Sequence, residues 1–148
     1  MSEVLLIAAF RNRAEALEYR TIAGEFRVAM VKTGEAYEFP PPPKNSKSWI
    51  LAHCRELLQV RSWERKRSFV CGFPDSQQQV TGRAEIRRNE ILWSFTTMEV
   101  SVSLCDRLLD EYWDILSSET AGSALDQGSS WTKGLFNFRF SDHDPDRS

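Results

Sequence analysis

The side chains best suited to nucleophilic chemistry are two histidines, His53 and His143, and three cysteines. His53 stands directly before Cys54, but adjacent residues of a helix do not face each other, so the two do not form an activated nucleophile and base. The sequence contains no GxSxG motif, no P-loop and no dinucleotide-binding glycine motif. We interpret His53 and Cys54 as buried structural residues and predict no catalytic residue.

Potential metal ligands gather near the end of the chain, at Asp142, His143, Asp144 and Asp146. A metal ion needs ligands that a rigid frame holds in place, and a proline interrupts this short polar segment. We therefore expect no metal ion and no cofactor. Residues 141–148 are predicted to be a polar, mobile tail that follows one domain of residues 1–140.

Three carboxylates, Asp106, Asp110 and Asp114, recur every four residues and would share one face of a helix. Residues 99–126 carry seven acidic and one basic residue, whereas residues 44–88 carry ten basic and four acidic residues. This uneven distribution of charge along the chain is evidence about binding partners and association, not about the fold. We choose Asp106, Asp110 and Asp114 as partner-binding residues. The alternatives are that this face is merely solvated, or that the two oppositely charged halves pair with each other.

A second hypothesis starts from Arg61–Arg67, whose sequence RSWERKR combines cations with a tryptophan. Such a mixture can follow phosphates and stack on a base. The isoelectric point of about 5.7 argues against a dedicated nucleic-acid protein. This alternative nucleic-acid-binding module would use Arg61, Trp63, Arg65, Lys66, Arg67, Arg83, Arg87 and Arg88. A third hypothesis is an enzyme whose site the sequence does not reveal.

For the first part of the chain, the elements that would position these side chains have more than one interpretation. Residues 3–10 read as a short apolar strand or as a segment that fills the core. Ala14–Ala23 is rich in helix formers, and Gly24 could end such a helix. Phe26–Val31 then predicts a strand, and a single helix over residues 14–33 is the competing interpretation.

Later elements have clearer patterns. Tyr37 and Phe39 predict a short strand before Pro40–Pro43, which can belong neither to a helix interior nor to a central strand. Ser46 is placed to cap a helix. The further predicted elements are a helix over 47–60, a meander of strands over 68–73, 80–87 and 90–100, a helix over 104–116, and a strand over 131–140.

The length of 148 residues, with 41% apolar and 27% charged residues, is typical of a single globular domain. We predict an α+β fold, with a mostly antiparallel sheet packed by two or three helices. The cysteines are widely separated and form no CxxC pair, which favours buried thiols in a reducing compartment. The sequence shows no signal-peptide pattern and no apolar run of membrane-spanning length, so we expect a cytoplasmic protein.

An ordered series of segments carries a family resemblance. It begins with EAYEFPPPP, KNSKSWILAHCRELL, RSFVCGFP and GRAEIRRNEILWSF, and it ends with SSWTKGLFNF. This order resembles that of some contact-dependent growth inhibition immunity proteins, over roughly half of the chain. The resemblance implies a small cytosolic protein without catalysis of its own, which binds and neutralises a toxin domain, often a nuclease, from a neighbouring cell. The choice of the Asp106 face rests on charge pattern and not on this family, since a basic partner suits an acidic face.

Overall fold

The computed structural model describes residues 2–42, 45–60, 65–74, 76–117 and 136–140. In order, these residues form α1 (Ser2–Arg11), β1 (Ala16–Ile22), β2 (Glu25–Lys32), β3 (Glu35–Glu38), α2 (Lys47–Leu57), β4 (Arg65–Gly72), β5 (Gln79–Arg87), β6 (Glu90–Glu99), α3 (Val102–Ser117) and β7 (Asn137–Phe140). The predicted α+β class and the packing of an antiparallel sheet by helices are confirmed. The predicted tail of residues 141–148 lies outside the described residues, as do residues 131–135 of the last predicted strand.

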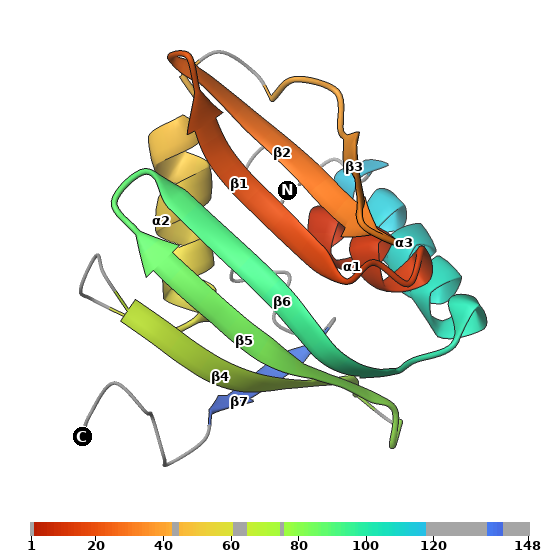
Figure 1. Cartoon of the computed structure of the whole chain (residues 1–148). Helices are drawn as coiled ribbons and strands as arrows, with labels where there is room; N and C mark the ends of the chain where they lie inside the picture. The colour runs from red at the N-terminus through yellow and green to blue at the C-terminus, as the bar shows by residue number, and fades with distance from the viewer. Residues whose placement is uncertain (1, 43–44, 61–64, 75, 118–135, 141–148) are drawn as a thin grey trace.

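The sheet has the strand order β3-β2-β1-β6-β5-β4-β7, and every neighbouring pair is antiparallel. Two meanders, β1-β2-β3 and β4-β5-β6, meet where β1 pairs with β6. The helices lie behind the sheet in Figure 1, so one sheet face packs on them and the other faces away. The predicted meander over residues 68–100 is confirmed, whereas the first meander was only partly predicted.

The strand predicted over Phe26–Val31 is confirmed as part of β2, but the helix predicted over Ala14–Ala23 and the competing single helix over residues 14–33 are both wrong. The segment is the hairpin β1-β2, with a turn at Ala23 and Gly24, whose φ angles are 53° and 80°. Successive positive φ angles match the twist of paired strands, which is why this turn makes a hairpin. β1 lies between β2 and β6, so pairing on both sides overrides the helix propensity of its residues.

The first segment is helical, so the strand alternative for residues 3–10 is wrong, but its core-filling role is confirmed. α1 buries Leu6, Ile7, Ala9 and Phe10 completely or almost so. Apolar residues on nearly every position hide the helical period, because a helix that is buried on most sides lacks a polar face. α1 packs mainly on α3, and it occupies the centre of the helix layer.

The apolar stripe that predicts a helix over residues 47–60 is Ile50, Cys54, Leu57 and Leu58. Ile50, Cys54 and Leu58 are fully buried, and Leu57 packs partly buried against the core. Ser46 occupies the position before the helix, but its side chain makes no capping hydrogen bond. The helix ends at Leu57, earlier than predicted, because Gln59 adopts a φ of 54°.

All three cysteines are buried and free, as predicted. Burial raises the pKa of Cys71 far above its usual value, and mainly burial raises that of Cys105 to about 11. Because thiolates rather than thiols attack disulfide reagents, we expect the folded protein to be nearly inert to Ellman's reagent at pH 8. In denaturant, Ellman's reagent should then react with all three thiols. Fast reaction of the folded protein would contradict this burial.

Candidate functional site

The acidic face predicted for a partner lies on α3, which the core holds firmly. Leu104, Cys105, Leu108 and Tyr112 are buried along one side of this helix. The Ser101 hydroxyl accepts a hydrogen bond from the backbone N–H of Leu104 at 3.1 Å, so this serine caps the helix. Because one side is fixed in the core, the opposite side of α3 presents its residues outward.

The structure places Asp106 and Asp110 on this outward side. Asp106 accepts a hydrogen bond from Nε of Arg11 at 2.5 Å, and the two side chains are 49% and 44% exposed. The hydrogen bond and the charge of Asp106 raise the pKa of Arg11. Asp110 is exposed and has no ion-pair partner among the described residues. Asp114 lies one turn further along α3, and its side chain is outside the described part of the structure.

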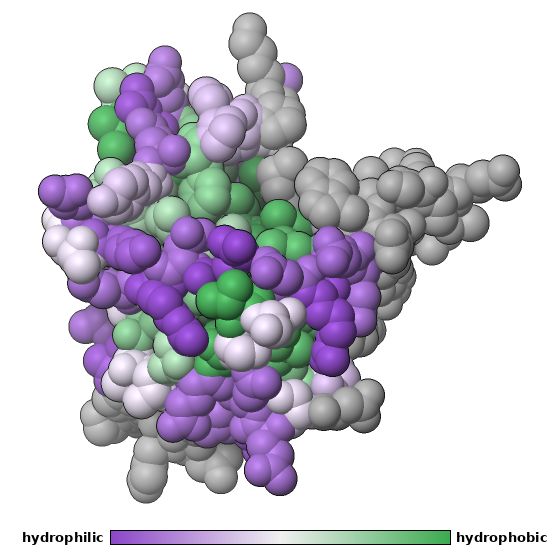
Figure 2. Space-filling model, turned by 90° about the vertical axis from the view of Figure 1, so that its right-hand side faces the viewer, coloured by the Kyte–Doolittle hydropathy of each residue, from purple (hydrophilic) through white to green (hydrophobic). Residues whose placement is uncertain are grey.

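Two further features of α3 complete this face. Its sequence carries four carboxylates and one guanidinium, and the one cation, Arg107, lies 3.9 Å from Glu111, a long contact. Val102, at the start of the helix, is 42% exposed. Figure 2 views the side of the molecule on which α3 lies and shows apolar residues ringed by hydrophilic ones. Such a combination is typical of a surface that binds another protein. We name Val102, Asp106, Asp110 and Glu111 the α3 face.

The structure divides the basic residues of the nucleic-acid hypothesis between the two faces of the sheet: Lys66, Arg83 and Arg87 share the outer face, whereas Arg65 and Arg67 lie on the helix-packed side. The guanidinium of Arg67 is 4.1 Å from the centre of the Phe140 ring. Arg87 pairs with Glu85 at 2.6 Å. Arg61 and Trp63 fall outside the described residues.

The outer face of the sheet is close to neutral. By strand register its described cations are Arg20, Arg27, Lys66, Arg83, Arg87 and Arg139, and its carboxylates are Glu18, Glu25, Glu38, Glu85, Glu90 and Glu99, six of each. Arg20 pairs with Glu18 on its own strand, β1, and with Glu90 on the neighbouring strand, β6. Three cations of the cationic segment 44–88, Lys66, Arg83 and Arg87, therefore share this face with as many carboxylates as cations. Arg87 and Arg107 each pair with a carboxylate of their own segment, Glu85 and Glu111.

A buried ion pair that the sequence did not reveal joins α1 to α2. Oε1 of Glu3 lies 2.5 Å from Nε2 of His53, and the two side chains are 2% and 17% exposed. Burial alone would raise the pKa of Glu3, but the hydrogen bond and charge of His53 outweigh it and lower this pKa to about 2. Burial and the charge of Glu3 raise the pKa of Tyr112 on α3. Glu3 thus lies where the three helices meet.

The described residues hold no group of three or more His, Cys, Asp or Glu side chains that could bind a metal ion. Within the same residues, no helix is long and apolar enough to cross a membrane. A comparison of the chain with protein-family models found no match, and a comparison with curated proteins found none either.

Proposed function

We propose that this protein is a non-catalytic, cytosolic binding protein that holds a basic protein partner against the α3 face, as an immunity protein holds a toxin domain. The observation that carries the proposal is the excess of carboxylates on a helix whose inner side is fixed in the core. The alternatives of a nucleic-acid module and of an enzyme have no comparable observation among the described residues.

The charge of the α3 face supports a basic partner. Asp110 is exposed and uncompensated, whereas carboxylates on the outer sheet face are matched by cations. Uncompensated charge at a surface steers an oppositely charged partner and raises the association rate. The exposed Val102 adds apolar surface, and the release of water from this surface on binding favours association.

The rigidity of the helix supports a stoichiometric inhibitor. Four residues of α3 are buried, and α1 packs along it, so the carboxylates are held before the partner arrives. A preformed surface loses little conformational entropy on binding, which favours tight association. An inhibitor that must cover an active surface benefits from this property.

The first experiment purifies the chain together with the product of the adjacent gene. We expect a stable one-to-one complex, and we expect the chain to protect cells that express that product. Absence of both co-purification and protection would rule out this function. Fluorescence anisotropy with a labelled single-stranded oligonucleotide tests the nucleic-acid alternative, which predicts binding that falls steeply with salt.

Replacing Asp110 with lysine should weaken the complex about tenfold or more, because a cation then faces a basic partner. The matched control is Glu56→Lys, which makes the same charge change at an exposed position of α2. Isothermal titration calorimetry measures both affinities, and circular dichroism checks that both variants keep the wild-type fold. Equal loss in the two variants would show that net charge, and not the α3 face, governs binding.

Replacing Arg11 with alanine should have the opposite effect. Asp106 then loses its neighbouring cation and becomes available to the partner, so affinity should rise about twofold to threefold. The pair is exposed, so the melting temperature should change little. Weaker binding of Arg11→Ala would instead indicate that the partner is acidic at this point.

A further inference from the structure

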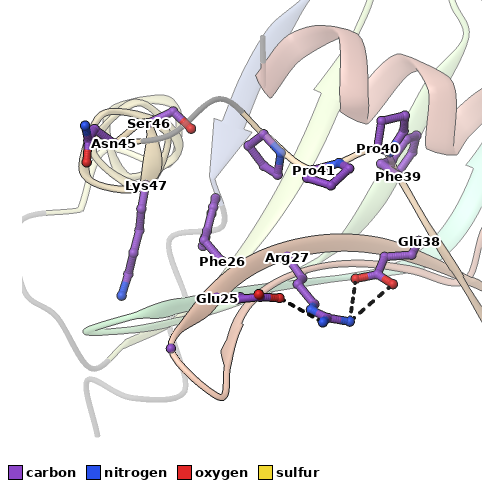
Figure 3. A pocket seen from close by; sticks show the side chains of 12 residues that line it. Glu25, Phe26, Arg27, Glu38, Phe39, Pro40, Pro41, Asn45, Ser46 and Lys47 are labelled. Atoms are coloured by element: carbon purple, nitrogen blue, oxygen red, sulfur yellow. Dashed lines mark hydrogen bonds and ion pairs between the residues drawn. The ribbon is translucent and has the colours of Figure 1, made fainter.

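A pocket far from the α3 face in sequence lies between the first meander and the start of α2. It has a volume of about 990 Å³, which is at the upper end for sites that take small molecules. The first turn of the sheet and β2 form one side, the segment after β3 forms the second, and the start of α2 forms the third (Figure 3).

Two phenylalanines and three prolines supply the apolar part of the pocket lining, beside six polar or charged residues. Phe26 lines it from β2, Phe39 lies beside Pro40 (Figure 3), and both phenylalanines are partly buried against the core. Pro40 and Pro41 follow Phe39 along this side (Figure 3), and Pro42 also lines the pocket. Proline has no backbone N–H, so this wall can accept hydrogen bonds but cannot donate any. An extended peptide backbone would find only half of its usual partners here, whereas a planar apolar body needs none.

The two cations that line the pocket, Arg27 and Lys47, differ in whether a carboxylate already pairs with them. Arg27 donates to Glu25 at 2.9 Å and to Glu38 at 3.2 Å, so this cation is already engaged by two carboxylates. Lys47, in the first turn of α2, lines the pocket and has no ion-pair partner among the described residues. Its side chain extends from the helix toward the sheet in Figure 3. An anionic group that enters the pocket would therefore pair with this lysine.

We propose that this pocket binds a small organic acid with a planar apolar body, such as an aromatic carboxylate. The ring lies between Phe26 and the segment of Phe39, Pro40 and Pro41, and the carboxylate pairs with Lys47. The site is independent of the α3 face, and its failure would leave the proposed function untouched.

The test titrates 2-naphthoate into the ¹⁵N-labelled protein and follows the amide signals. We expect shifts centred on Gly24, Phe26 and Ser46, with a dissociation constant of about 1 mM or below. The neutral analogue 2-naphthalenemethanol should bind about fivefold more weakly because it lacks the charge. Shifts confined to other parts of the protein, or equal binding of acid and alcohol, would overturn the proposal.

Two variants separate the lysine from general charge effects. Lys47→Met keeps the length of the side chain and should abolish the preference for the acid over the alcohol. Lys32→Met removes an exposed lysine at the end of β2, outside the pocket, and should keep that preference. If both variants lose it equally, Lys47 is not the partner of the carboxylate. Tighter binding of acetyl-Phe-Asp-amide than of 2-naphthoate would show that the pocket serves a peptide, which also overturns the proposal.

Discussion

Replacement of Gly82 with alanine is expected to lower the free energy of unfolding by about 3 kcal/mol or more. A Cβ atom at this position would lie 2.1 Å from the backbone oxygen of Ser94 and 3.0 Å from the ring of Phe69. The oxygen belongs to the neighbouring strand β6, at the bulge between Thr81 and Gly82, so the two central strands would have to separate. Loss of their pairing would also disturb Trp93, a fully buried residue of β6.

The matched control is Gly72→Ala on β4. A Cβ at Gly72 meets nothing within 4 Å, so the same substitution should change stability by no more than about 0.5 kcal/mol. Urea denaturation followed by tryptophan fluorescence measures both variants against the wild type. If Gly82→Ala were as stable as Gly72→Ala, the close approach of β5 and β6 would be wrong.

Replacement of Glu3 with glutamine is expected to cost about 2 to 3 kcal/mol at pH 7 and almost nothing near pH 2. The folded-state pKa of Glu3 is about 2, below the value of 4.5 for an exposed glutamate. A carboxylate whose pKa is lowered by folding stabilises the protein above its unfolded-state pKa. This contribution is lost as the pH falls from about 4.5 to about 2. The stability difference between wild type and Glu3→Gln should therefore shrink across this interval.

Glu56→Gln is the control for this pH dependence. Glu56 is exposed on α2, the helix that also carries His53, so its substitution should leave the acid unfolding profile almost unchanged. Urea midpoints at a series of pH values from 7 to 2 measure the three proteins. A difference between wild type and Glu3→Gln that stays constant with pH would show that the pair with His53 contributes no charge-dependent stability.

Much of the fold could be predicted because its signals are local. The residues Ile50 and Cys54 lie on one side of α2, and Val80, Ala84 and Ile86 alternate along β5, and burial follows both patterns. For the candidate site, too, only the local part could be predicted. The spacing of Asp106 and Asp110 is enough to place them on one helix face, but it says nothing about Arg11, which lies 95 positions away from Asp106.

The sequence by itself determined the α+β class, the second meander, α2, α3 and the burial of the cysteines, because periodic apolar residues must turn toward a core. Only the tertiary structure decided the rest. Residues 14–33 became strands because β1 pairs on both sides, and Glu3 found His53 because α1 and α2 pack together. Three cations of the segment 44–88, Lys66, Arg83 and Arg87, came to share one sheet face with acidic residues of other strands. Each of these outcomes depends on contacts between residues far apart in the chain, and no local pattern encodes such contacts.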